Sequence, residues 1–250
     1  MPENKHLIKH RFKKNLGTYD KHAFVQKQTA SKLIEMLIEN SGVNFSDIYE
    51  IGCGTGILTG QIADKLSFNN LYTNDIVESS EEFVKNLSDK ITFTAGDAET
   101  VFPDKKFDLI ISNAVFQWFS DLPAFLTKIS LNLNEGGILA FASFGPENLR
   151  EINSITNCGL KYPSMDEIKT ATEPYFNCLV SCSDTCVVIF ESPIEILKHL
   201  KYSGTNGLNQ KTWVKKDLAE FEQKYRELFS TKDGVRLTYN PIWFIAKRLL

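Results

Sequence analysis

The stretch Glu50-Ile51-Gly52-Cys53-Gly54-Thr55-Gly56 decides the fold of this 250-residue chain. It follows a short apolar run at residues 47–51, and the residues after it carry apolar side chains at helical spacing, namely Ile57, Leu58, Ile62 and Leu66. A glycine-rich turn between a strand and a helix lets a ligand approach the backbone closely. The stretch therefore predicts a ligand-binding turn in an α/β sheet.

The glycine spacing separates the possible ligands. A dinucleotide site needs the spacing G-x-G-x-x-G, so that helix N–H groups meet a pyrophosphate. Counted from Gly52, the third glycine of that pattern would fall at Ile57, whereas Gly56 gives G-x-G-x-G preceded by the acid Glu50. An anionic residue at this point favours a ligand with a positive end over one with two phosphates. The spacing thus argues against a nicotinamide oxidoreductase.

The wider pattern predicts the sheet. Five short apolar runs alternate with helical stretches, at residues 47–51, 70–76, 91–94, 107–112 and 137–144. We expect a helix at 29–40 before them and, after them, extended segments at 180–190 and 235–245 with helices at 193–202 and 215–229 between. The fold class is therefore α/β, a doubly wound, mostly parallel seven-stranded sheet. A helical lid, about residues 192–232, is inserted between the last two strands.

The charge composition limits the kinds of partner that the protein can bind. Lys and Arg number 28 against 31 Asp and Glu, a net charge of -3 that argues against nucleic-acid binding. Positive charge is concentrated in residues 1–14, a basic arm that would steer an acidic partner; it carries Lys5, Lys9, Arg11, Lys13 and Lys14. No apolar run approaches the ~20 residues that span a bilayer, and no secretory signal is present. We expect a cytoplasmic protein with no membrane partner.

The glycine stretch resembles motif I of the class I S-adenosylmethionine-dependent methyltransferases, whose Rossmann-like fold matches the expected sheet. The resemblance implies S-adenosyl-L-methionine as cofactor, with Glu50 orienting its methionine part and Asp97 and Ala98 meeting the adenine. Asp75, about twenty residues past the turn, is placed to take the ribose hydroxyls. Asn113 would line the methyl-transfer channel, and Trp118 and Phe119 are interpreted as core packing. The full set of cofactor candidates is Glu50, Gly52, Cys53, Gly54, Gly56, Asp75, Ile76, Asp97, Ala98, Asn113, Gln117 and Gln26.

Four further segments resemble one subfamily, the malonyl-acyl-carrier-protein O-methyltransferases of biotin synthesis. They are Phe12 with residues 17–26 (GTYDKHAFVQ), 144–152 (FGPENLREI), 197–206 (LKHLKYSGTN) and 237–243 (LTYNPIW), with a departure at Gly207. The resemblance implies a single methyltransferase domain over 1–250: an entrance segment at 1–28, a cofactor-binding core at 29–145 and substrate-side elements at 146–250. It implies malonyl-acyl carrier protein, or malonyl-CoA, as substrate; the oligomeric state stays open.

The expected reaction needs correct placement of the substrate carboxylate but no general base to deprotonate it. A malonyl carboxylate, with a pKa near ~4, is already ionised at neutral pH. The catalytic candidates are Tyr19, Arg150 and Lys201. Arg150 could grip the carboxylate through its bidentate fork, or could pair with Glu147 or Glu151 on a solvated helix. Tyr19 could donate to the substrate or cover the sulfonium, or could only pack the lid; Lys201 is a positive charge of the lid.

The cysteines and histidines suggest no metal. Cys178, Cys182 and Cys186 have the spacing C-x3-C-x3-C, one residue too long for the radical S-adenosylmethionine motif. We interpret them as small apolar residues sharing one face of an extended segment. The four histidines lack metal-ligand spacing. Two alternatives to the main hypothesis remain: a methyltransferase for another small acid or a quinol, and a non-catalytic scaffold with this fold.

Overall fold

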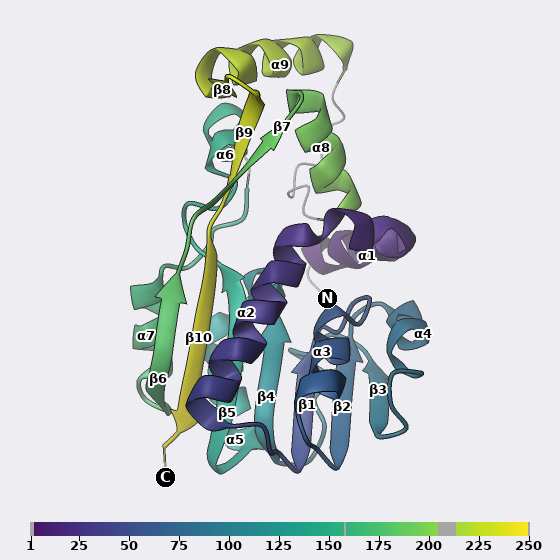
Figure 1. Cartoon of the computed structure of the whole chain (residues 1–250), viewed down its shortest axis with the longest axis vertical. Coiled ribbons are helices and arrows are strands. Elements are labelled where there is room, and N and C mark those ends of the chain that lie inside the picture. The colour runs from purple at the N-terminus through teal and green to yellow at the C-terminus, as the bar shows by residue number, and fades with distance from the viewer. Residues whose placement is uncertain (1–2, 158, 205–213, 250) are drawn as a thin grey trace.

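A central seven-stranded sheet organises the molecule (Figure 1). The computed structural model describes residues 3–157, 159–204 and 214–249. The strand order is β3-β2-β1-β4-β5-β10-β6, and β10 alone runs in the direction opposite to the other six strands. The predicted mostly parallel seven-stranded sheet is therefore confirmed. Its strands are β1 (Asp47–Ile51), β2 (Asn70–Asp75), β3 (Ile91–Ala95), β4 (Phe107–Asn113), β5 (Leu133–Phe144), β6 (Phe176–Ser183) and β10 (Pro241–Arg248).

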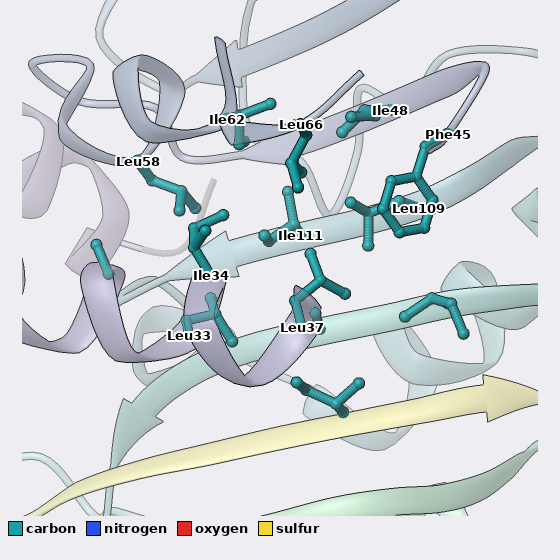
Figure 2. Packing of buried hydrophobic residues seen from close by; sticks show 14 of the residues in the cluster. Leu33, Ile34, Leu37, Phe45, Ile48, Leu58, Ile62, Leu66, Leu109 and Ile111 are labelled. Atoms are coloured by element: carbon teal, nitrogen blue, oxygen red, sulfur yellow. The ribbon is translucent and has the colours of Figure 1, made fainter. Parts of the chain in front are cut away.

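Helices cover both faces of this sheet because successive strand residues point to opposite sides. On one face, α2 (Phe24–Ser41) and α3 (Ile57–Lys65) bury Leu33, Ile34 and Leu37 against Ile48 and Ile111 (Figure 2). On the other face lie α5 (Leu122–Asn132) and α7 (Met165–Thr172). Each fully buried Leu or Ile contributes about 1.5–3 kcal/mol. The helix expected at 29–40 begins five residues earlier, at Phe24.

Beyond the sheet stands a second layer that we call the cap. It contains a three-stranded sheet of β7 (Cys186–Phe190), β9 (Gly234–Tyr239) and β8 (Ser230–Thr231), with three helices packed on it (Figure 1). The helices are α6 (Arg150–Thr156), α8 (Pro193–Tyr202) and α9 (Lys215–Phe229). The helices predicted at 193–202 and 215–229 are confirmed. The predicted lid at 192–232 includes residues 205–213, which lie outside the described part, as does the departure at Gly207.

The two late extended segments are not single strands, and this expectation was wrong. Each one divides where the chain passes from the main sheet into the cap sheet, after β6 and before β10. Asn240 holds this junction: its side-chain amide donates to the Asp184 carbonyl at 2.7 Å, and its side-chain oxygen accepts from the Glu147 N–H at 3.2 Å. Two short connections, at residues 184–185 and at residue 240, thus join the two sheets.

The N-terminal helix α1 (Glu3–His22) lies between the core and the cap (Figure 1). It contacts α8, where the Asn15 side-chain amide donates to the Lys201 carbonyl at 2.9 Å. The remaining short helices are η1 (Glu78–Ser80), α4 (Glu81–Val84) and η2 (Phe116–Trp118). No helix in the described ranges is long and apolar enough to cross a membrane.

The cysteine segment departs from the expectation that its three thiols share one face. A bulge at Leu179 shifts the register, so that Cys178 pairs with Ala246 and Cys182 with Trp243, on opposite faces of the sheet. Cys186 lies in β7 of the cap sheet. Within residues 3–157, 159–204 and 214–249, no three His, Cys, Asp or Glu side chains are grouped to hold a metal. Cys158 lies outside these ranges.

Candidate active site

A pocket opens at the carboxyl ends of β1, β2, β3 and β4, the edge where parallel sheets bind ligands. One face of α1 forms its roof. The roof residues, three or four positions apart and hence on a single helical stripe, are Lys5, Ile8, Phe12, Leu16 and Tyr19. The predicted residues that line the pocket are Tyr19, Gly52, Gly54, Asp75, Ile76, Asp97, Ala98 and Asn113. Thr55, Asn74 and Val77 line it as well and were not predicted.

The glycine turn has the backbone that its sequence demands. Gly52, Gly54 and Gly56 have φ values of 74°, 54° and 81°, in the left-handed region that favours glycine. A Cβ at Gly52 would lie 2.3 Å from Val115 Cγ2, so no side chain fits there. Gly56 precedes α3 and Cys53 is buried, and neither lines the pocket. The turn therefore presents backbone at Gly52 and Gly54.

Glu50 is a fully buried carboxylate behind this turn. Its Oε2 accepts from Thr59 Oγ1 at 2.7 Å, whereas its Oε1 has no hydrogen-bond partner among the described residues. Burial raises the pKa of Glu50 to about 8. An unsatisfied buried acceptor is costly unless a ligand completes it. Glu50 thus fits a ligand that carries a positive group or a strong donor.

Asp75, at the end of β2, lies beside the turn. Its Oδ2 accepts the Gly54 N–H at 2.8 Å and its Oδ1 accepts the Val77 N–H at 2.8 Å. Burial raises the pKa of Asp75, although these two backbone bonds oppose the shift. The carboxylate is therefore oriented by the backbone on both sides, with its remaining lone pairs available to a pair of hydroxyls.

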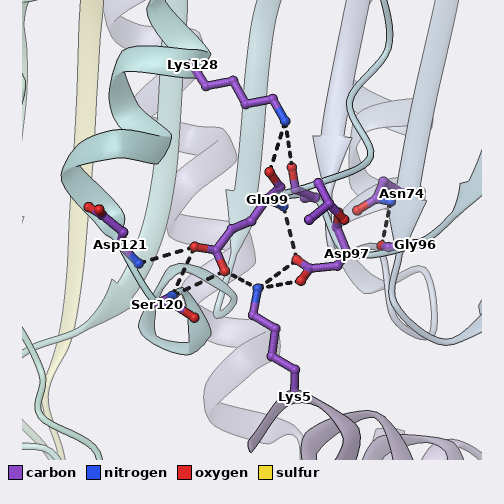
Figure 3. A network of polar contacts seen from close by, with 10 residues as sticks. Lys5, Asn74, Gly96, Asp97, Glu99, Ser120, Asp121 and Lys128 are labelled. Atoms are coloured by element: carbon purple, nitrogen blue, oxygen red, sulfur yellow. Dashed lines mark hydrogen bonds and ion pairs between the residues drawn. The ribbon is translucent and has the colours of Figure 1, made fainter. Parts of the chain in front are cut away.

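The end of β3 meets the roof at an ion-pair cluster (Figure 3). Lys5 Nζ lies 2.8 Å and 2.6 Å from the two Asp97 oxygens, and it also pairs with Glu99. Glu99 in turn accepts the backbone N–H groups of Ser120 and Asp121 at 3.1 Å and 3.2 Å. The Lys5 side chain is 6% exposed, so its assignment to a solvent-facing basic arm was wrong.

Asn113 joins the pocket to α2. Its Oδ1 accepts from Thr29 Oγ1 at 2.8 Å, and its Nδ2 donates to the Gln26 carbonyl at 3.0 Å. Gln26 therefore contributes through its backbone and does not itself line the pocket. Gln117 is also outside the lining, and its side chain bonds to the Ala114 carbonyl and to Ser143.

The aromatic residues after β4 have two roles. Phe119 packs with Phe116 and Phe125 in the core, as expected, but it also lines the pocket. Trp118 lines the pocket too and meets Phe12 of the roof edge-on, with ring centroids 5.8 Å apart. The interpretation as core packing is thus confirmed for Phe119, whereas Trp118 stands at the pocket wall, and contact of either side chain with a ligand is untested.

The three catalytic candidates lie in different surroundings. Tyr19 lines the pocket, and its burial raises the pKa of its hydroxyl. Arg150 is half exposed on α6, with Nη1 2.8 Å from Glu147 and Nε 3.7 Å from Glu151. Lys201 is exposed at the end of α8. Neither Arg150 nor Lys201 belongs to the pocket lining, and their roles toward the substrate stay predictions.

Fold and site together define a methyltransferase. The sheet has the strand order β3-β2-β1-β4-β5-β10-β6, and the glycine turn with its preceding acid and the carboxylate ending β2 lie within residues 49–141, which match the methyltransferase domain family. The N-methyltransferase NodS from Bradyrhizobium japonicum, solved in complex with S-adenosyl-L-homocysteine, superposes with a TM-score of 0.54 at 14% identity, covering 88% of this chain and 86% of NodS.

Two relatives refine the class. The malonyl-[acyl-carrier protein] O-methyltransferase of Calditerrivibrio nitroreducens is 37% identical over 96% of both chains. That of Chlorobium luteolum is 36% identical over 98% of this chain and 96% of its own. The chain belongs to the malonyl-[acyl-carrier protein] O-methyltransferase family, and it is an S-adenosylmethionine-dependent O-methyltransferase.

Proposed function

We propose that this protein transfers a methyl group to the free carboxylate of malonyl-acyl carrier protein, giving the methyl ester that primes pimeloyl synthesis for biotin. The observation that carries the proposal is the near-complete match to relatives of that name, 37% identical over 96% of each chain for one of them. The pocket supports it, because its groups fit the cofactor that such a reaction needs.

S-adenosylmethionine fits the groups at the strand ends. Glu50, with its unpartnered Oε1, would face the cofactor's ammonium group across the glycine turn. Asp75 would take the ribose hydroxyls, and Asp97 with the Ala98 backbone would meet the adenine. When bound, the cofactor supplies an electrophilic methyl group on a sulfonium.

The protein's own contribution is placement and exclusion of water. An ionised carboxylate is already a nucleophile, so the site needs no general base. Ile8, Phe12 and Leu16 of α1 line the pocket with apolar surface, and Tyr19 lines it as well. Correct in-line placement is worth up to ~7–11 kcal/mol in favourable cases. We infer that α1 and the strand ends together hold the reacting groups in line.

The three parts of the chain would divide this work. The entrance segment, 1–28, would cover the cofactor through α1, the core, 29–145, would hold the cofactor, and the substrate-side elements, 146–250, would receive the substrate. An acidic carrier would dock near the contact of α1 with α8, where Lys13, Lys14 and Lys201 are exposed. Lys9 and Lys198 are paired with Glu78 and Glu195, which leaves them weaker in this role.

Mass spectrometry tests the proposal directly. Malonyl-acyl carrier protein incubated with enzyme and S-adenosylmethionine should gain the mass of one methylene unit, and the Asp75→Ala variant should slow this gain. Malonyl-CoA and a malonyl thioester of a small uncharged thiol, assayed in parallel, identify the preferred carrier. A carrier-bound malonyl group that gains no mass, while another small acid or a quinol does, would overturn the proposal in favour of that alternative. No methylation of any acceptor by a protein that binds the cofactor would instead favour the scaffold hypothesis.

A further inference from the structure

The ion-pair cluster at Lys5 joins two parts of the site that are far apart in the sequence. Lys5 stands near the start of the roof helix, and Asp97 and Glu99 follow β3, 92 and 94 residues later. All three side chains are largely buried, with exposed fractions of 6%, 5% and 16%. Buried ion pairs of this kind are costly to break from one side, because the remaining charges are left unpaired. The cluster therefore favours one position of the roof.

The two carboxylates are held differently. Glu99 is fixed by Lys5 and by the backbone N–H groups at Ser120 and Asp121, so its oxygens are well supplied with donors. Asp97 Oδ1 accepts from Lys5 and from the Glu99 N–H at 3.1 Å, whereas Oδ2 accepts only from Lys5 among the described residues. A carboxylate oxygen can accept more than one hydrogen bond. Asp97 Oδ2 thus keeps capacity for a ligand while it remains paired.

Lys5 belongs to the lining of the same pocket. It lies on the α1 stripe with Ile8 and Phe12, and Phe12 touches Trp118 on the opposite wall. Lys5 Nζ also lies 5.6 Å above the Phe119 ring. Beside the predicted adenine position, roof and floor therefore meet through the charged contact of Lys5 and the aromatic contact of Phe12. Nearer the glycine turn, α1 also meets the floor through the Lys9–Glu78 pair and through Asp20, whose Oδ1 accepts from Thr55 Oγ1 at 2.6 Å. Lys5 and α1 therefore line the side of the pocket next to the predicted adenine position.

We propose that Lys5 is a positioning residue for the cofactor: it holds Asp97 oriented toward the adenine and latches α1 over the bound adenosyl group. The proposal rests on the proposed function, because it takes the adenine to lie at Asp97. The Asp97 carboxylate would then both hold α1 over the pocket and bind the adenine. The latch slows the exit of the cofactor and of its demethylated product, and it supports binding rather than competing with it.

Dissociation of S-adenosylhomocysteine tests the latch. Labelled S-adenosylhomocysteine bound to the full chain is chased with excess unlabelled ligand, and its exit rate is followed. Lys5→Met should raise the exit rate about tenfold or more and weaken the affinity correspondingly, whereas Lys5→Arg, which keeps the charge, should restore most of both. Lys14→Met is the matched control: it removes an exposed lysine from the same helix, off the roof stripe, and the exit rate should change less than about twofold.

A double-variant cycle separates positioning from mere support of the fold. If Lys5 acts through Asp97, Lys5→Met should raise the exit rate by a clearly smaller factor once Asp97→Asn is present, because the part that acts through Asp97 is already lost and only the pair with Glu99 remains to be broken. Glu99→Gln leaves Asp97 and Lys5 in place, so it should raise the exit rate by a smaller factor than Lys5→Met does. This variant tests the latch if Lys5→Met does not fold.

Three results would overturn the latch. The first is an exit rate within twofold of the parent in both Lys5→Met and Glu99→Gln, and the second is a tighter affinity in Lys5→Met, which would mean that Lys5 competes with the adenine. The third is full additivity of Lys5→Met with Asp97→Asn. None of these three results would contradict the proposed methyl transfer. A parent protein that binds no S-adenosylhomocysteine would instead overturn the proposed function, and the latch with it.

Discussion

Glu50 has opposite effects on folding and on binding, and one substitution should separate them. Burial disfavours its charge in the free protein, whereas the proposed cofactor, with its ammonium group, needs that charge. Glu50→Gln replaces the carboxyl group by a neutral amide of nearly the same shape, whose oxygen can still accept from Thr59 Oγ1. We expect the variant to fold more stably at neutral pH and to bind S-adenosylhomocysteine more weakly.

The magnitude follows from the pKa of Glu50, about 8 in the folded protein against an ordinary 4.5. Between these values the unfolded chain releases the proton and the folded chain keeps it, so folded stability falls as pH rises, by ~1.4 kcal/mol per pH unit. At pH 7 the loss reaches roughly 3 kcal/mol, which glutamine removes. For a chain of this size that corresponds to a rise in Tm of roughly 6–12 °C. At pH 5 the gain should fall below ~1 kcal/mol.

Thermal unfolding of parent and variant at pH 5, 6, 7 and 8, with calorimetric titration of S-adenosylhomocysteine at pH 8, measures both effects. The affinity should fall by about 1.5–3 kcal/mol, the contribution of a hydrogen bond to a charged group. A variant less stable than the parent at pH 8, or a Tm gain equal at pH 5 and pH 8, would refute the reasoning on burial. Unchanged affinity would remove Glu50 from the cofactor site.

The remaining predictions concern the ribose, Arg150 and the carrier. Asp75→Ala should weaken S-adenosylmethionine binding by about 1.5–3 kcal/mol in calorimetry, and unchanged affinity would remove Asp75 from the site. Arg150→Ala should lower kcat/KM less than fivefold, because the half-exposed pair with Glu147 is worth at most ~1 kcal/mol; a loss of several hundredfold would show instead that Arg150 grips the substrate carboxylate. KM for malonyl-acyl carrier protein should rise with salt as the screening length falls toward ~8 Å, while KM for a small malonyl thioester should not; equal responses would contradict electrostatic docking.

Local patterns were enough to predict the core of the fold. The strands β1 to β4 coincide with apolar runs in the sequence. The helices α8 and α9 have the predicted bounds. Ser192 caps α8, and α9 has an apolar stripe with Phe221 and Tyr225 buried. The glycine turn and Asp75 were predictable because a parallel sheet brings consecutive strand ends to one edge. The local pattern of strand, turn and helix therefore predicts that Asp75 lies next to the glycine turn, although the two are about twenty residues apart in the sequence.

The cap sheet and Arg150 were not predictable in this way. An apolar run does not reveal whether it stays in one sheet, and the break at Asn240 depends on its bonds to Asp184 and Glu147, residues far away in the sequence. Arg150 was expected near the pocket from its place after β5, but the turn at 145–149 carries it to the cap, where Glu147 and Glu151 pair with it. Position along the chain alone could not decide between its two possible roles.

The lysines of the basic arm lie on different faces of α1, which their charge alone did not reveal. Charge alone grouped Lys5 with the other basic residues of the arm as a surface for an acidic partner. Lys5 nevertheless falls on the same helical stripe as Ile8 and Phe12, and a residue in phase with buried neighbours shares their surroundings. Lys13 and Lys14, off that stripe, are exposed. A lysine drawn inward needs a carboxylate partner, and the acids that follow β3 provide two. The positive charge of α1 is therefore divided between its faces, so that Lys5 acts on the cofactor side and only the outward lysines are available to an acidic carrier.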